Sequence, residues 1–106
     1  LVKGAAHITG GGLLKNLPRV LPDSLAVTLE IANWPRPPVF TWLQKVGRVD
    51  ETELLRTFNC GIGMALIVSA EDAPAATTLL EGAGETVFSI GKIVSRADGE
   101  AAVRVI

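Results

Sequence analysis

The residues best suited to ligand binding form a glycine-rich stretch near the start of the chain, from His7 to Gly12, followed by Asn16 and Arg19. Three successive glycines allow backbone N–H groups to turn toward a ligand without a side-chain clash. A helix beginning there adds unpaired N–H groups and the positive end of its dipole. A hydroxyl, an amide and a guanidinium can supply further donors to an anion oxygen. The stretch therefore predicts a phosphate site made by Thr9, Gly10, Gly11, Gly12, Asn16 and Arg19.

The same stretch also has a purely structural interpretation. Glycines before a helix often form only a tight turn, and this triplet matches neither the P-loop pattern nor the dinucleotide-binding fingerprint. His7, at the end of an expected strand, is either a hydrogen-bonded structural histidine or a catalytic proton carrier. Arg19 is equally suited to capping the carbonyl end of a helix. The residue types alone leave both interpretations open.

A second candidate cluster lies where an expected helix gives way to a strand, over residues 56–64. Asn59 tolerates unusual backbone angles, and Gly61 and Gly63 permit close approach of a ligand or of another backbone. These three residues are secondary site candidates, although a helix C-cap with close packing is the favoured interpretation. Cys60 has no evident base partner, so we expect a small buried hydrophobic residue rather than a nucleophile.

Composition limits the classes of function. The 106 residues are 48% hydrophobic and 20% charged, with a net charge of −1, which is typical of one globular domain, residues 1–106. Balanced charge and few aromatic residues argue against nucleic-acid binding, which needs a basic surface and stacking platforms. A single cysteine cannot close an intramolecular disulfide, and one His with one Cys cannot complete a zinc site, so we expect no metal site.

The apolar stretches and the start of the chain predict its location in the cell. No apolar stretch approaches the ~20 residues that span a bilayer, and no charged-then-apolar leader opens the chain. We therefore expect a soluble, cytoplasmic protein without a membrane partner. The chain begins at Leu1 without a methionine or a polar lead-in, so we also expect it to be a piece of a larger protein.

Hydrophobic periodicity and the positions of Gly and Pro predict alternating strands and helices. Strands are expected over residues 2–9, 25–29, 62–68, 87–94 and 102–106, and helices from residue 13 to about 18 and over 39–46, 51–58 and 75–80. The order of these elements predicts an α/β fold in which helices pack on a mixed β-sheet.

Three local patterns refine this prediction. The continuous apolar run 62–68 predicts a central strand covered on both faces. Asp50 and Glu53 form a capping box for the helix that follows, whereas either Ser69 or Asp72 can cap helix 75–80. Asp98-Gly99 predicts a hairpin turn between the last two strands.

Several segments in register resemble the family of phosphoribosylformylglycinamidine cyclo-ligases, also called aminoimidazole ribonucleotide synthetases. They are His7–Leu13, Asn16–Pro22, Phe40–Gln44 and Arg56–Met64, extended by Gly84-Glu85 and Ile90-Gly91. The resemblance covers essentially the whole chain in order, and so many segments in register are far more specific than any one of them. It implies the C-terminal domain fold of that family, with this chain forming most of the C-terminal α/β half of a larger two-domain enzyme.

The resemblance also implies a reaction. In this step of purine biosynthesis, ATP activates the formyl oxygen of formylglycinamidine ribonucleotide, and an internal nitrogen closes the imidazole ring to give aminoimidazole ribonucleotide, ADP and phosphate. ATP and Mg²⁺ are then held mainly by a missing N-terminal half, and the full-length enzyme is a homodimer. The fragment is expected to be inactive alone and to orient the ribonucleotide through its 5′-phosphate at Thr9 to Gly12.

Two other functions stay open. The same fold can serve a non-catalytic phosphate- or nucleotide-binding module that senses a ligand or acts as a scaffold. It can also belong to a related synthetase of the same superfold. The segments Asn16–Arg19 and Asn59–Gly61 favour the cyclo-ligase over that related synthetase.

Overall fold

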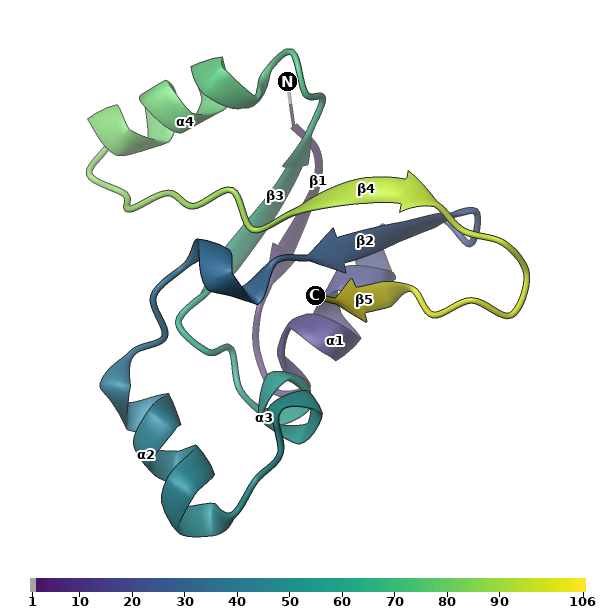
Figure 1. Cartoon of the computed structure of the whole chain (residues 1–106). Coiled ribbons are helices and arrows are strands. Elements are labelled where there is room, and N and C mark those ends of the chain that lie inside the picture. The colour runs from purple at the N-terminus through teal and green to yellow at the C-terminus, as the bar shows by residue number, and fades with distance from the viewer. Residues whose placement is uncertain (1) are drawn as a thin grey trace.

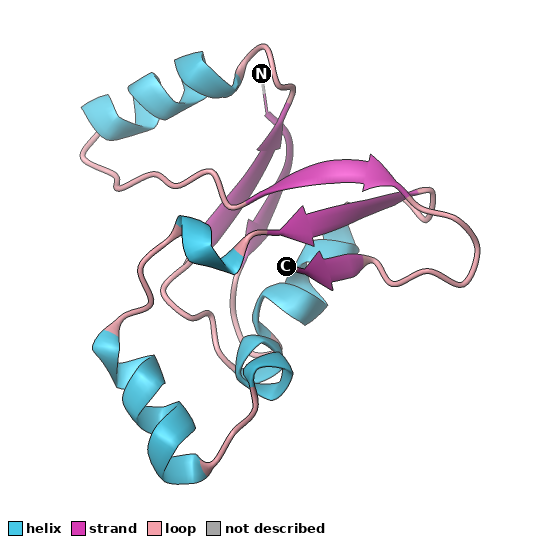
Figure 2. Cartoon of the chain, viewed as in Figure 1, coloured by secondary structure: helices cyan, strands magenta, loops and turns pink. Residues whose placement is uncertain are grey.

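The computed structural model describes residues 2–106, in which strands and helices alternate along the chain (Figures 1 and 2). The strands are β1 (Val2–His7), β2 (Leu25–Leu29), β3 (Met64–Val68), β4 (Gly91–Ser95) and β5 (Val103–Val105). The helices are α1 (Gly12–Asn16), α2 (Pro38–Gly47), α3 (Glu51–Thr57) and α4 (Ala73–Gly82), with short 3-10 turns η1 (Leu17–Val20) and η2 (Ile31–Asn33). The predicted α/β fold class is confirmed.

The strands form two small sheets rather than one. β1 pairs antiparallel with β3, which places Ala6 opposite Ala65 and His7 opposite Met64. β2 lies between β4, which is antiparallel to it, and β5, which is parallel to it, so the second sheet is mixed. Figure 1 shows the two sheets as separate sets of arrows with different strand directions. The mixed pairing was predicted, but the division into two sheets was not.

The expected hairpin between the last two strands is wrong. A tight turn does form around Asp98-Gly99, where the Glu100 N–H donates to Ala97 O at 3.1 Å. However, β4 and β5 pair with opposite edges of β2 and not with each other. The strand before the turn also begins at Gly91 rather than at residue 87. Long-range pairing with β2 therefore overrides the local hairpin signal.

The expectation that residues 62–68 form a central strand covered on both faces is also wrong. Within the described residues, β3 has only β1 as a neighbour. Met64 is 57% exposed and Leu66 is 38% exposed, whereas Ala65 between them is buried. A groove of about 1330 Å³ runs between β3, α4 and residues 84–93. The apolar run indicated burial on both faces, but the outer face is open to this groove.

The core gathers where α1 packs against α3. The largest fully buried side chains are Leu13, Leu29, Leu54, Leu55 and Cys60. Figure 1 shows α1 and α3 next to each other, whereas α4 projects away from them. The well-packed part of the molecule is therefore the corner where β1 ends and α1 and α3 meet.

Helix starts follow the sequence signals. The predicted capping box at α3 is confirmed, because the Asp50 side chain accepts a hydrogen bond from the Glu53 N–H at 2.8 Å. At α4, the Ser69 hydroxyl oxygen accepts from the Asp72 N–H at 3.3 Å. The Asp72 side chain accepts no capping bond within the described chain. Ser69 is therefore the residue whose side chain contributes to this helix start.

Candidate functional site

The corner between β1 and α1 is a tight turn. Thr9 O accepts from the Gly12 N–H at 2.9 Å, and Gly11 O accepts from the Lys15 N–H at 3.2 Å. Gly11 and Gly12 have φ values of 100° and 60°, in the left-handed region that favours glycine. Among residues 2–106, no group accepts a hydrogen bond from the Gly10 or Gly11 N–H. These two N–H groups are therefore left unused by the described part of the chain.

Gly12 and Gly10 differ sharply in their surroundings. A Cβ atom at Gly12 would lie 1.9 Å from Leu55 O and 2.5 Å from Phe58 O. Only glycine lets α1 approach the carbonyl end of α3 so closely. A Cβ atom at Gly10 would meet nothing within 4 Å. Gly12 thus serves packing, and its N–H is engaged by Thr9, whereas Gly10 faces open space.

Asn16 holds the corner together from inside. Its side chain is buried, and Nδ2 donates to Gly12 O at 2.8 Å, to Thr9 O at 3.3 Å and to Gly10 O at 3.4 Å. Asn16 Oδ1 accepts from the Arg19 Nη1 at 3.2 Å and from the Thr9 hydroxyl at 3.4 Å. Asn16 is therefore saturated by the loop itself. It shapes the corner, and through it Arg19 is held beside Thr9.

Asn59 and Gly61 form the second tight turn, between α3 and β3. Asn59 Oδ1 accepts from the Gly61 N–H at 2.9 Å, and Asn59 O accepts from the Ile62 N–H at 3.0 Å. Cys60 and Gly61 have φ values of 52° and 99°, and a Cβ atom at Gly61 would lie 2.6 Å from Pro37 Cδ. Gly61 is thus required for a close approach of two chain segments, in keeping with the packing interpretation.

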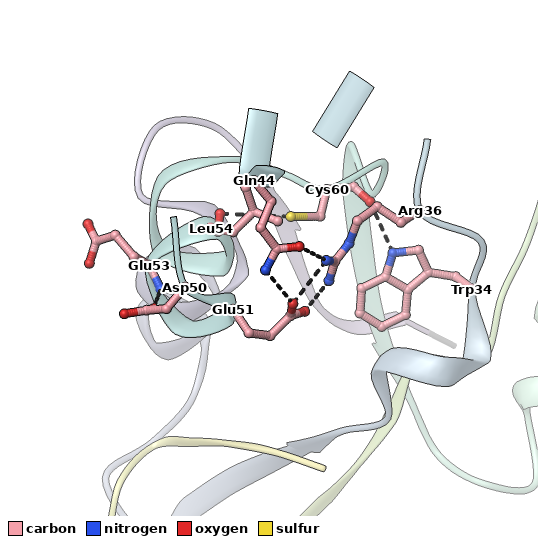
Figure 3. Close-up of polar contacts among 8 residues, drawn as sticks. All are labelled: Trp34, Arg36, Gln44, Asp50, Glu51, Glu53, Leu54 and Cys60. Carbon is pink, nitrogen blue, oxygen red and sulfur yellow. Dashed lines mark hydrogen bonds and ion pairs between the residues drawn. The ribbon is translucent and has the colours of Figure 1, made fainter. Parts of the chain in front are cut away.

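The proline-rich segment before α2 crosses this turn and anchors it (Figure 3). Trp34 Nε1 donates to Cys60 O at 3.1 Å. Arg36 forms a two-point ion pair with Glu51, and Gln44 bonds to both partners. These contacts tie the segment to α2 and α3 together, so they fix where α2 begins.

This network shifts the acidity of its members. The hydrogen bond from Arg36 lowers the pKa of the Glu51 carboxyl below its ordinary value, with a further contribution from Gln44. The same hydrogen bond raises the pKa of Arg36. Burial raises the pKa of the Cys60 thiol, and its Sγ lies 3.8 Å from Leu54 O as a donor. Cys60 is therefore a protonated, buried thiol at neutral pH, which fits the predicted small core residue.

The two turns meet at a pocket of about 220 Å³. It is lined by Ile8, Thr9, Gly10, Phe40, Thr57, Phe58 and Asn59. Thr9 and Gly10 from the first cluster thus lie beside Asn59 from the second, which sequence spacing alone did not reveal. The lining also includes two phenyl rings that were not singled out as site residues, although both fall inside the segments that carry the family resemblance.

Other candidate residues lie outside this pocket. His7 is exposed and pairs with Met64 across the β1–β3 sheet. Gly61 and Gly63 line the larger groove instead, and the Gly63 carbonyl accepts from the Ile8 N–H at 2.9 Å. Gly12, Asn16 and Arg19 support the corner from behind. No group of three or more metal-ligating side chains occurs among the described residues.

Comparison with known proteins decides the family. The family described as AIR synthase related protein, C-terminal domain, matches residues 1–104. The chain belongs to this family. This membership agrees with the resemblance carried by the glycine corner and by the Asn59 turn. Both of these motifs line the pocket.

Curated relatives of this AIR synthase family member are named phosphoribosylformylglycinamidine cyclo-ligase. The protein from Paraburkholderia xenovorans is 58% identical over 99% of this chain and 30% of its own length. The protein from Aromatoleum aromaticum is 56% identical over 95% of this chain and 29% of its own length. The protein from Methylobacillus flagellatus is 51% identical over 99% of this chain. The chain thus spans about 30% of the length of these relatives.

The helices of this family member are short. Within residues 2–106, none combines the length and the apolar character needed to cross a bilayer.

Proposed function

We propose that this chain is the ribonucleotide-facing part of an ATP-dependent cyclo-ligase. The enzyme closes the imidazole ring of formylglycinamidine ribonucleotide and yields aminoimidazole ribonucleotide, ADP and phosphate. ATP transfers its terminal phosphoryl group to the formyl oxygen, a substrate nitrogen attacks the activated carbon, and phosphate leaves. The observation that carries this proposal is the pocket that unites Thr9, Gly10 and Asn59, in a chain 51–58% identical to proteins named for this activity.

The role of the glycine corner in this reaction is to hold the 5′-phosphate. The N–H groups of Gly10 and Gly11 have no protein acceptor among residues 2–106, and the adjacent Thr9 is an exposed residue whose hydroxyl donates to Asn16 Oδ1. Arg19 adds positive charge beside Thr9 through its bond to Asn16. Gly12 and Asn16 contribute by fixing the shape of the turn. Several such donors together hold an anion, because each is individually weak.

ATP and Mg²⁺ do not fit the residues described here. The lining of the pocket is neutral, and residues 2–106 contain no group of three or more ligating side chains of the kind that could hold Mg²⁺. We therefore assign both to the N-terminal half of the full-length enzyme. His7 stays a candidate proton carrier for the ring closure, since it is exposed and lies two residues before Thr9.

The surface of the chain supports a role within a longer protein. Its accessible area is 6702 Å², compared with about 5,700 Å² expected for a compact monomer of this mass. Val39, Trp42 and Val46 form an exposed apolar stripe along α2, and Met64 and Leu66 border the open groove. Large exposed apolar surfaces indicate contact with other protein. We infer that the chain is most of the C-terminal half of a two-domain, homodimeric, cytoplasmic enzyme and is inactive alone.

A chimera tests this function. Residues 1–104 would replace the corresponding segment of the Paraburkholderia xenovorans cyclo-ligase, and phosphate release would be measured with formylglycinamidine ribonucleotide and ATP. We expect a chimera with substrate-dependent phosphate release and formation of aminoimidazole ribonucleotide. A folded chimera that binds ATP but releases no phosphate would contradict the proposed function and favour a non-catalytic binding module.

A further inference from the structure

The pocket between the two turns differs in character from the glycine corner at its rim. Its lining comes from Ile8–Gly10, from Phe40 of α2 and from Thr57–Asn59 at the end of α3. None of these residues carries a charge, and two of them are phenylalanines whose ring centroids lie 5.9 Å apart with the rings tilted by 54°. A dianionic phosphate is poorly solvated between phenyl rings, since no cation there replaces its water.

The hydrogen-bonding groups of the pocket are neutral donors and acceptors. Asn59 Oδ1 is used by the Gly61 N–H, and this bond leaves Nδ2 without an acceptor among residues 2–106. The Thr9 hydroxyl donates to Asn16, so its oxygen can still accept a hydrogen bond. Such neutral donors and acceptors can pair with the ring nitrogens and the amino hydrogens of a planar heterocycle.

The size of the pocket limits what enters it. Its volume of about 220 Å³ is below the ~300–1,000 Å³ of pockets that enclose whole drug-sized ligands. One small ring fits, but a complete ribonucleotide does not. Planar rings pack well against tilted or offset aromatic faces. The ribose and phosphate of a ribonucleotide bound here would extend past Gly10 toward Gly11.

We propose that this pocket holds the uncharged five-membered nitrogen ring of the product ribonucleotide, stacked on Phe40 or Phe58 and hydrogen-bonded by Asn59. The phosphate stays outside, on the N–H groups of Gly10 and Gly11. This inference rests on the proposed function, because it assumes that a ribonucleotide binds at the corner. It assigns ring recognition to Phe40, Phe58 and Asn59, and phosphate recognition to the glycines.

Three probes separate the two subsites. Aminoimidazole ribonucleotide carries ring and phosphate, its nucleoside carries only the ring, and ribose 5-phosphate carries only the phosphate. Binding is followed by NMR on the ¹⁵N-labelled chain, using the Gly10 and Gly11 N–H signals and the Asn59 side-chain amide. We expect ribose 5-phosphate to shift only the glycine signals, and the nucleoside to shift the Asn59 side chain.

Matched variants then test the ring contacts. Phe40→Leu should weaken ribonucleotide binding about tenfold and leave ribose 5-phosphate binding unchanged, whereas Trp42→Leu, on the exposed stripe of the same helix, should change neither. Asn59→Ser, whose hydroxyl can still accept from the Gly61 N–H, should also weaken only the ribonucleotide. The NMR spectrum of each variant confirms that it is folded.

The outcomes distinguish this inference from the proposed function. If both variants bind the ribonucleotide as tightly as the wild-type chain does, the proposal that the pocket binds the ring is wrong. The proposed phosphate site is not contradicted by that result. The ring pocket would also be overturned if ribose 5-phosphate itself shifts the Asn59 side chain and binds less tightly to Phe40→Leu. If neither the ribonucleotide nor ribose 5-phosphate binds the wild-type chain, the proposed function fails, and the ring pocket fails with it.

Discussion

The inner and outer sides of the glycine corner show how residues of one type take opposite roles. On the inner side, Gly12 packs against the carbonyl groups of Leu55 and Phe58, and Asn16 is buried and saturated by the loop. On the outer side, Gly10 has open space around it and lines the pocket with Asn59. The inner side determines the shape of the turn, and the outer side presents N–H donors that no group among residues 2–106 uses. Stability and binding should therefore respond to different substitutions.

The largest loss of stability is expected at Gly12. In Gly12→Ala, the added Cβ atom would fall 1.9 Å from Leu55 O, in backbone with a φ of 60°. The helices α1 and α3 must separate, which should lower the free energy of unfolding by more than about 3 kcal/mol. Chemical denaturation measures this loss, with Gly10→Ala as the control that should change stability by less than about 0.5 kcal/mol. Equal losses of stability at both positions would contradict the assignment of packing to the inner side alone.

Asn16 should give the next largest effect. In Asn16→Ala, the carbonyl groups of Thr9, Gly10 and Gly12 lose their shared donor. Losing these bonds, of which the one to Gly12 O is buried, should lower the free energy of unfolding by about 1–3 kcal/mol. Thermal unfolding followed by circular dichroism measures the change. Asn33→Ala, which removes an exposed side-chain amide, should cost much less, and a similar cost for both would show that Asn16 is not the centre of the corner.

The Arg36–Glu51 pair should make a smaller contribution that depends on pH. Because the folded-state pKa of Glu51 is lowered from its ordinary value of 4.5, its contribution is full above that value and is lost as pH falls through the lower, folded-state pKa. Partial exposure of both side chains limits the effect to about 1 kcal/mol or less. Glu51→Gln should therefore reduce stability at pH 7 and flatten its decline below pH 4.5, as urea titrations at several pH values would measure. An identical acid dependence in both proteins would rule out this role for Glu51.

Leu66 should give a small effect in the isolated chain. Its side chain is 38% exposed beside the open groove, so Leu66→Ala should lower the free energy of unfolding by about 1 kcal/mol or less, compared with 2–5 kcal/mol at fully buried leucines. Leu55→Ala, at a fully buried position, supplies the matched control. If the groove is covered within the full-length enzyme, the same Leu66 substitution in the chimera should cost more. Equal costs in the chain and in the chimera would show that the groove stays open.

Local signals in the sequence predicted much of the fold. Alternating apolar residues indicated β2, and the capping box correctly located the start of α3. The division into two sheets escaped prediction because strand partners are chosen by contacts between distant segments. The parallel pairing of β5 with β2 and the exposure of Leu66 have no local signature. A continuous apolar run looks the same whether its second face is buried in its own chain or against another part of a protein.

The candidate site was predictable in its residues but not in its assembly. Thr9, Gly10 and Asn59 were each singled out from their types and neighbours. Their meeting in one pocket depends on the packing of α1 on α3, which no spacing in the sequence encodes. The packing role of Gly12 could not be predicted for the same reason, since the Leu55 carbonyl that requires it lies far along the chain.

The central claim is that the outer side of the glycine corner binds the phosphate of a ribonucleotide. Gly10→Val tests it most directly, because a Cβ atom at this position at the pocket rim meets nothing within 4 Å. Calorimetric titration with aminoimidazole ribonucleotide should show at least tenfold weaker binding than to the wild-type chain, with the free energy of unfolding changed by less than about 1 kcal/mol. Unchanged affinity in a folded Gly10→Val protein would contradict the claim.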